Sequence, residues 1–204
     1  MIKHMFNQDL QTQIDYLEKV LAKSKTISKV LELAPKLPLP NWYLGAGAIC
    51  QTIWNELHGF PLEQGIKDCD LVYFDADISA DAQDRFIQKG KKLFAELPIE
   101  VELTNEARVH LWYKEEVGKD IQPYTSAEDA INTWPTTASS VGVRYENGNF
   151  LVYAPYGLND MMRLIVRANK GLITREVYEK KVERWTQAWP KLTAIPWDAS
   201  GFEE

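Results

Sequence analysis

Two aspartates one residue apart are the side chains of this sequence best suited to chemistry. Asp68 and Asp70 flank Cys69 at the start of an apolar, β-rich segment, DCDLVYFD. Alternate residues of a strand project from the same face, so the two carboxylates can share a hard cation such as Mg²⁺ or Mn²⁺. Acid pairs also occur as simple caps at strand ends. The pair therefore predicts a metal site only together with its neighbours.

A turn of small residues precedes the acid pair along the chain. Gly45, Ala46 and Gly47 follow the apolar segment WYL and precede an expected helix over residues 48–57. Small residues at such a turn let phosphate oxygens approach the backbone N–H groups of the helix N-terminus. Tight packing between strand and helix also requires small residues. Placed next to Asp68 and Asp70, the turn favours a site where nucleotide phosphates meet a divalent cation.

A third carboxylate is available on the segment PIEVELT. Its alternation places Glu100, Glu102 and Thr104 on one face and Val101 and Leu103 on the other. A third acid can ligate the catalytic metal and help to deprotonate an attacking hydroxyl. Glu100 and Glu102 are the two candidates.

Arginine 108 and the aromatic residues are weaker candidates. Arg108 and His110, in NEARVHLWY, can reach a phosphate or an acceptor if the strand ends near Thr104. His110 is flanked by apolar residues, a setting that is at least as typical of a structural histidine as of a catalytic one. Several tryptophans and tyrosines could stack a base, but in a small domain they more often form the core. Further basic candidates for phosphate contacts are Lys67, Arg144, Arg163 and Arg167. Each of these residues is more often a surface charge or an ion-pair partner.

Apolar spacing and capping residues predict the elements around these side chains. Helices are expected over residues 10–21, 27–33, 80–97, 126–134 and 174–189, with Ser126 and Thr174 as N-caps. Strands are expected at WYL, from Asp68 onward and over residues 99–104. A hairpin over residues 141–155 turns at Asn147-Gly148. This pattern predicts an α/β (α+β) fold in which helices flank a small mixed sheet.

The same residues carry a resemblance to a known superfamily. The stretch from Tyr43 to Asp75 resembles the DNA polymerase beta-like nucleotidyltransferases in its glycine turn, helix and Asp-x-Asp strand. The phrases QTIWN, GIKDCDLVYFD, NEARVHLWY, APYGLND and WPKLTAIPW, within residues 41–197, resemble an uncharacterised bacterial family of predicted nucleotidyltransferases. The resemblance implies a nucleotidyltransferase fold, a phosphate turn at residues 45–47, metal ligands Asp68 and Asp70, and Glu102 as the third acid. Cys50-Gln51 stands where some relatives carry Arg-Asn or Arg-Asp, which removes one triphosphate contact.

Composition sets the boundaries of this prediction. The chain has 204 residues, a formal charge of −6 and two cysteines, Cys50 and Cys69, with no CxxC spacing. The negative charge argues against general nucleic-acid binding, and the cysteine usage fits a reducing cytoplasm. No signal peptide or membrane span is expected. We expect one domain over residues 1–204, with a helical cap (1–40), a catalytic core (41–155) and a helical extension (156–204).

The combined prediction is a Mg²⁺-dependent nucleotidyltransferase. A nucleoside triphosphate would donate its nucleoside monophosphate to the hydroxyl of an acceptor that the sequence does not identify, and pyrophosphate would leave. Arg108 is included among the candidate phosphate contacts. The alternative is a nucleotide-sensing or interaction protein that keeps the fold without turnover. It is suggested by Cys50, which stands where some relatives carry an arginine. A toxin-neutralising partner is a third possibility with little support in the sequence.

Overall fold

A computed structural model describes residues 5–199, in which a mixed sheet forms the centre of the molecule. Within these residues, five strands pair in the order β3-β2-β1-β4-β5. Their bounds are β1 (Tyr43–Gly45), β2 (Asp68–Tyr73), β3 (Glu100–Asn105), β4 (Gly142–Glu146) and β5 (Asn149–Tyr153). In this five-stranded sheet, only β2 and β3 run parallel. Strand β1 is antiparallel to β2 and to β4, and β4 is antiparallel to β5.

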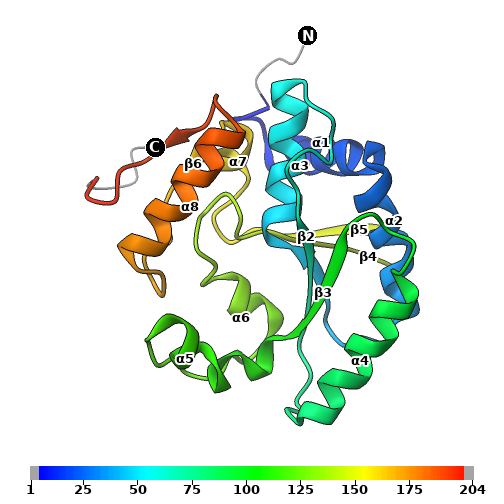
Figure 1. Cartoon of the computed structure of the whole chain (residues 1–204). Coiled ribbons are helices and arrows are strands. Elements are labelled where there is room, and N and C mark those ends of the chain that lie inside the picture. Colours follow the sequence, from blue (N-terminus) through cyan, green and yellow to red (C-terminus); the bar gives the residue numbers. More distant parts are fainter. Residues whose placement is uncertain (1–4, 200–204) are drawn as a thin grey trace.

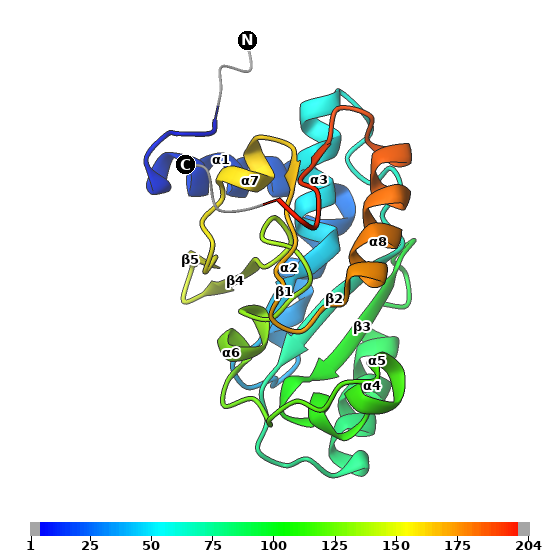
Figure 2. The same cartoon turned by 90° about the vertical axis from the view of Figure 1, so that its left-hand side faces the viewer.

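Helices lie on both sides of this sheet (Figure 1). On one side are α1 (Leu10–Lys23), α2 (Lys25–Leu33), α3 (Ala46–His58) and α4 (Ala80–Leu93), of which α3 packs on β2 and α4 on β3. On the other side are α5 (Tyr113–Val117), α6 (Ala127–Ile131) and α8 (Arg175–Ala188). Figure 2 looks onto this second side, where β2 and β3 run between α8 and the α5–α6 region.

A continuous apolar core joins the sheet to the helices of the first side. Strand β2 contributes its odd-numbered residues to this core, namely Cys69, Leu71 and Tyr73, and β1, β3 and β4 contribute Leu44, Leu103 and Val143. The α8 helix belongs to the same core through Trp185, which packs edge-on against Trp54 of α3 with ring centroids 5.0 Å apart. Because β2 alternates, Asp68 and Asp70 must project from the opposite face.

That opposite face is covered by α6 over β1 and over Val72 of β2, whereas Glu100 and Glu102 of β3 are exposed on it. A second, smaller apolar cluster joins Tyr43 and Val72 to Ala127 and Ile131 of α6. The connection from β3 to α6 contains the 3₁₀ helix η2 (Glu106–Leu111) and α5. No helix of the described part of the chain is both long and apolar enough to span a bilayer.

The predicted α/β arrangement is confirmed, with corrections to individual elements. Ser79, Ser126 and Thr174 cap their helices, and Asn147 and Gly148 take φ values of 52° and 81° at the hairpin turn. The α4 helix ends at Leu93 rather than Leu97, because the following segment turns and buries Phe94. The sequence did not predict α7 (Asn159–Met162), the parallel pair β6 (Ile165–Val166) and β7 (Thr193–Ala194), or the short 3₁₀ helix η1 (Ala34–Lys36).

Candidate active site

Four carboxylates line the face of β2 and β3 that points away from the main apolar core, which we call the acid face: Asp68, Asp70, Glu100 and Glu102. The parallel register pairs Asp68 with Glu100 and Asp70 with Glu102. Paired residues of neighbouring strands project to the same side of a sheet. The predicted alternation on both strands is therefore observed, and the structure brings Asp68, Asp70 and Glu102 together at one end of the sheet.

Burial and neighbouring charges raise the pKa values of two carboxylates of the acid face, Asp70 and Glu102. Burial, followed by the charges of Asp68 and Glu102, raises the pKa of Asp70 to about 6. Partial burial, followed by Asp68 and Glu100, raises the pKa of Glu102 above its ordinary value. No hydrogen-bond donor among residues 5–199 reaches either carboxylate within bonding distance. An uncompensated carboxylate pair is the environment in which a divalent cation relieves repulsion.

The acids do not form a ready-made three-ligand cage. Within residues 5–199, no three His, Cys, Asp or Glu side chains converge closely enough to make a metal site by themselves. The donor set is nonetheless made of hard carboxylate oxygens, which Mg²⁺ prefers, and Mg²⁺ usually keeps several waters and binds through one or two carboxylates. Asp68 and Asp70 on one strand face fit that pattern, with Glu102 beside them.

The glycine turn lies directly beside Asp70, because Gly45 is the register partner of Asp70 across β1 and β2. A Cβ on Gly45 would come within 2.4 Å of the Trp134 ring, so packing alone demands glycine at this position. Ala46 begins α3 with a φ of 54°, and its N–H donates to the carbonyl of Val141 at 3.2 Å. The amides left to face a phosphate at the N-terminus of α3 are those of Gly47 and the residues after it.

A lysine from α8 faces the acid face, and the sequence reasoning missed it. Lys181 is half-buried, and the charges of Asp70 and Asp68 act on it across the site. Burial, followed by the charge of Arg184, lowers its pKa. Lys181 stands three residues after Tyr178 and four before Trp185, both buried. A lysine on the apolar stripe of a helix was the signal that could have revealed it.

A buried glutamate is the second residue that the sequence reasoning missed. Glu106 begins η2 and is 5% exposed, with no hydrogen bond or ion pair to its carboxylate from residues 5–199. Burial, followed by the charge of Asp70, raises its pKa to about 8. An acid between Asn105 and Ala107 gives no periodic signal of its burial.

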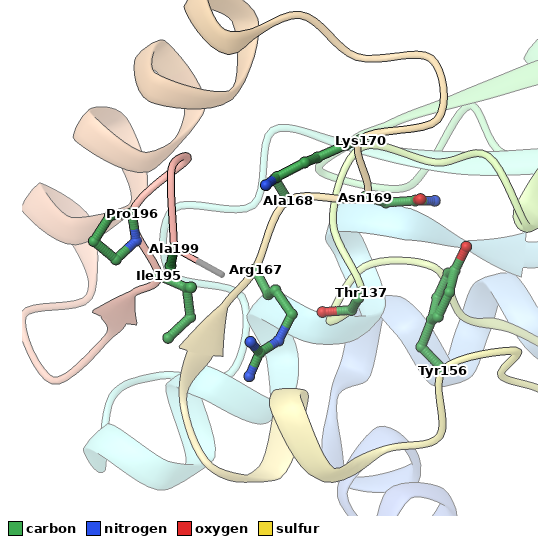
Figure 3. A pocket seen from close by; sticks show the side chains of 9 residues that line it. All are labelled: Thr137, Tyr156, Arg167, Ala168, Asn169, Lys170, Ile195, Pro196 and Ala199. Atoms are coloured by element: carbon green, nitrogen blue, oxygen red, sulfur yellow. The ribbon is translucent and has the colours of Figure 1, made fainter. Parts of the chain in front are cut away.

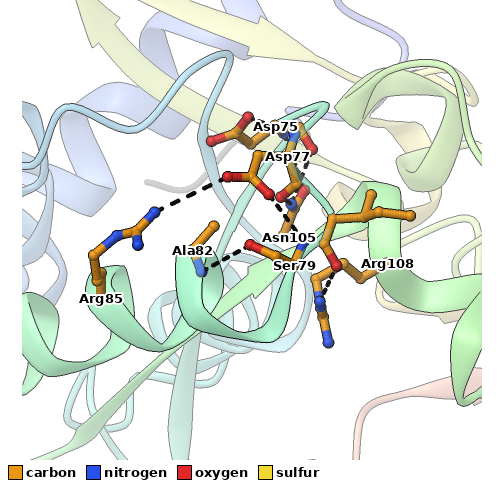
Figure 4. Close-up of polar contacts among 8 residues, drawn as sticks. Asp75, Asp77, Ser79, Ala82, Arg85, Asn105 and Arg108 are labelled. Carbon is orange, nitrogen blue, oxygen red and sulfur yellow. Dashed lines mark hydrogen bonds and ion pairs between the residues drawn. The ribbon is translucent and has the colours of Figure 1, made fainter.

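Arg108 lies at the other end of β2 from the acid face. Its Nη1 donates to the carbonyl of Ile78, in the loop after β2 (Figure 4). That loop also contains Asp75 and Asp77. Asp75 accepts from the N–H of Asp77 at 2.9 Å, and Asp77 accepts from the N–H of Ser79 at 3.0 Å. The structure therefore does not bring Arg108 to the carboxylates with which it was grouped.

Of the remaining basic candidates, Lys67 is exposed and the three arginines have local partners. Arg144 lies over the ring of Tyr43 and pairs with Glu146 at 3.3 Å. Arg163 lies over the ring of Phe6, 5.4 Å from its centroid. Arg167 pairs with Asp160 at 3.0 Å. None of these three contacts involves the acid face.

A separate cavity of about 320 Å³ opens beside β6 and the C-terminal segment (Figure 3). Arg167 and Thr137 project toward it, and both bind Asp160, at 3.0 and 2.6 Å. Asn169 uses its amide N–H groups on the carbonyls of Asn132 and Trp134. No residue of the acid face lines this cavity.

Comparison with known proteins gives two matches. The sequence model of a family described as nucleotidyltransferase matches residues 32–194. A solved structure, described as an NMR structure that reveals a CCA-adding enzyme head domain, superimposes with a TM-score of 0.70 and 26% sequence identity. The alignment covers 91% of this chain and 95% of that one. No curated protein matches the sequence significantly.

Proposed function

The chain belongs to this nucleotidyltransferase family, and on that basis we propose that it transfers a nucleoside monophosphate from a nucleoside triphosphate to an acceptor hydroxyl, with Mg²⁺ as cofactor. The family and the fold support a transferase that uses a nucleoside triphosphate. The metal, the acceptor and the residue roles below belong to the proposal.

One observation carries the proposal: Asp70 stands between the glycine turn and a second acid strand. Gly45 pairs with Asp70 on one side and Glu102 pairs with it on the other. A phosphate at the N-terminus of α3 would then lie next to the metal-binding carboxylates. Transfer of a nucleotidyl group needs this juxtaposition, because triphosphate, cation and attacking oxygen must meet at one phosphorus.

The carboxylates fit a Mg²⁺ site through their oxygen donors and their mutual repulsion. Asp68 and Asp70 would hold the ion, with Glu102 as the third acid. When bound, Mg²⁺ supplies charge neutralisation for the triphosphate and for the pyrophosphate that leaves. Mn²⁺ satisfies the same oxygen donors.

The protein's own groups then position the reactants. The amides at the start of α3 would bind phosphate oxygens, aided by the partial positive charge of that helix end. The acceptor oxygen attacks the α-phosphorus, the bond from that phosphorus to the bridging oxygen breaks, and pyrophosphate departs. The acceptor proton passes to a carboxylate or to water, and Glu102, being exposed on the acid face, can accept it.

Labelled triphosphates test the proposal directly. Each of ATP, GTP, CTP and UTP, labelled on the α-phosphate, is incubated with Mg²⁺, the protein, and either an RNA pool or a metabolite extract. We expect the label to join an acceptor with release of unlabelled pyrophosphate, and to remain in the triphosphate with Asp68→Asn or Asp70→Asn. Transfer that survives both substitutions would contradict the assigned site.

A second function is favoured by one observation at the turn. Cys50 is fully buried, burial raises the pKa of its thiol to about 12, and α3 contains neither Lys nor Arg. A site poor in cations at the turn suits nucleotide sensing without turnover. Mg²⁺-dependent binding that needs Asp70, combined with no product from any acceptor, would favour the sensor.

A further inference from the structure

We propose that a cationic groove along α8, with Lys181 at its centre and Arg184 one turn further along, binds the β- and γ-phosphates of the triphosphate. This inference rests on the proposed function, because it assigns a role in the same site. The helix that begins at the glycine turn contains no Lys or Arg. In this proposal, α8 supplies the cations for the phosphates.

The first support is the position of Lys181. Its ammonium group experiences the charges of Asp68 and Asp70. Nevertheless, no carboxylate of residues 5–199 lies within the 4.0 Å of an ion pair with it. Lys181 is therefore a half-buried cation whose charge is not neutralised by an ion pair with the described residues, and an anion can bind to it. Figure 2 shows α8 beside β2 and β3.

The second support is the rigidity of the helix that carries Lys181. The ammonium lies 4.6 Å from the centroid of the Trp185 ring, a cation–π distance. Trp185 is 2% exposed and packs against Trp54 of α3, the helix that begins at the glycine turn. Lys181 is thereby fixed relative to the amides that would hold the phosphates, which is what a preorganised binding site requires.

The third support is a groove of about 410 Å³ along the same helix. Its lining includes three cations, Lys180, Lys181 and Arg184, and one acid, Glu183. Arg184 lies close enough to Lys181 for its charge to act on that residue, as expected for residues three apart on a helix. The groove therefore has a net positive charge, and Lys181, on which the charges of Asp68 and Asp70 act, is the residue that links it to the acid face.

The test separates the proposed phosphate site on α8 from the metal site by using a probe that needs no metal. Inorganic tripolyphosphate is titrated calorimetrically into the full-length protein in Mg²⁺-free buffer. Lys181→Met keeps the stem that packs on Trp185 but removes the charge. We expect its tripolyphosphate binding to be about tenfold weaker than that of the unsubstituted protein, and Lys181→Arg to restore most of the affinity. Asp70→Asn should bind tripolyphosphate at least as tightly, because a negative charge is removed.

The matched control is Lys92→Met, which removes the same charge from the exposed surface of α4. Its tripolyphosphate affinity should stay within about twofold of the parent, since exposed charges contribute little. A second readout is the preference for ATP over AMP in Mg²⁺: Lys181→Met should reduce it about tenfold, a change that a purely structural role would not produce.

The outcomes are distinguishable. If the parent binds no tripolyphosphate, or Lys181→Met binds it as the parent does, the α8 inference is wrong. If in addition Mg²⁺-dependent ATP binding still requires Asp70, the proposed function stands without it. If ATP binding depends on neither Mg²⁺ nor Asp70 while tripolyphosphate binding requires Lys181, the phosphate site on α8 is supported and the proposed metal chemistry is wrong.

Discussion

Strand β2 has an Asp-x-Asp pair at each end, and the two pairs have opposite environments. At its start, Asp68 and Asp70 lack hydrogen-bond donors among residues 5–199, and the pKa of Asp70 is raised to about 6. In the loop after its end, Asp75 and Asp77 accept backbone N–H groups, and bonds from Ser79 lower the pKa of Asp77. The same spacing therefore serves a structural turn in one place and leaves reactive, repelling carboxylates in the other.

The comparison teaches how to choose between acid pairs. Carboxylates that stabilise a fold are compensated by donors, as those of Asp75 and Asp77 are by backbone N–H groups of their own loop, whose backbone Asn105 also binds (Figure 4). Carboxylates kept for a ligand remain uncompensated, at a cost in stability. Each prediction below perturbs one side of this contrast.

The largest expected difference is in activity. Asp70→Asn should lower nucleotidyl transfer about a thousandfold or more, because a metal ligand is lost, while its thermal stability should equal or exceed that of the parent. Asp77→Asn, the matched substitution in the other pair, should keep activity within about threefold. Transfer rates with α-labelled triphosphate and thermal denaturation of both variants provide the check. Equal losses of activity would remove the distinction between the two pairs.

Next in size is the stability contributed by Asn105, which binds the backbone of the loop that carries the structural pair. Asn105 is 1% exposed; it accepts from the N–H groups of Asp75 and Ala107 and donates to the carbonyl of Asp75. Asn105→Ala should lower the free energy of unfolding by about 3 kcal/mol, because buried backbone groups lose their partners. Urea denaturation measures the change. A loss below about 1 kcal/mol would mean that water replaces Asn105 readily.

A pH-dependent effect of about 2–4 kcal/mol is expected from Glu106. Its pKa is raised from 4.5 to about 8 in the folded protein, so between these values the folded state binds a proton that the unfolded state releases. Stability therefore falls as pH rises through this window and levels off above it. Glu106→Gln should remove this slope and be more stable than the parent at pH 8.5. Denaturation of both proteins at pH 5 and 8.5 tests the sign; parallel pH profiles would contradict it.

The smallest effect concerns the ion pair beside the structural acids. Arg85 lies 4.0 Å from Asp77, and both side chains are more than half exposed. Arg85→Ala should change the free energy of unfolding by less than about 0.5 kcal/mol, since solvent and salt screen such pairs. Equilibrium denaturation at low and high salt tests this estimate. A larger, salt-sensitive loss would show that the loop depends on side-chain charge as well as on backbone donors.

Local patterns in the sequence were sufficient to predict the acid face. Acids alternate with apolar residues in DCDLVY and EVEL, so period-two reasoning placed Asp68, Asp70 and Glu102 correctly on one side of each strand. The register that aligns Asp70 with Glu102 depends on pairing between distant segments. Sequence spacing could not establish that alignment, and it emerged only from the structure.

Contacts between distant segments account for what was missed. The need for glycine at position 45 comes from the Trp134 ring, far along the chain. The orientation of Lys181 depends on how α8 docks onto α3 through two tryptophans. The strands β6 and β7 contain two residues each, too few for an alternating pattern. Arg108 is a further example of a contact between distant segments. Its side chain donates to the carbonyl of Ile78, and its position in the sequence did not predict this contact.

The most direct test of the central claim is a calorimetric titration of the four nucleoside triphosphates with and without Mg²⁺, using the parent, Asp70→Asn and Asp77→Asn. The assignment of the metal site to Asp68 and Asp70 predicts Mg²⁺-dependent binding of at least one triphosphate by the parent and Asp77→Asn, and its loss in Asp70→Asn. Mg²⁺-dependent binding that persists in Asp70→Asn, or no binding to the parent at all, would contradict it.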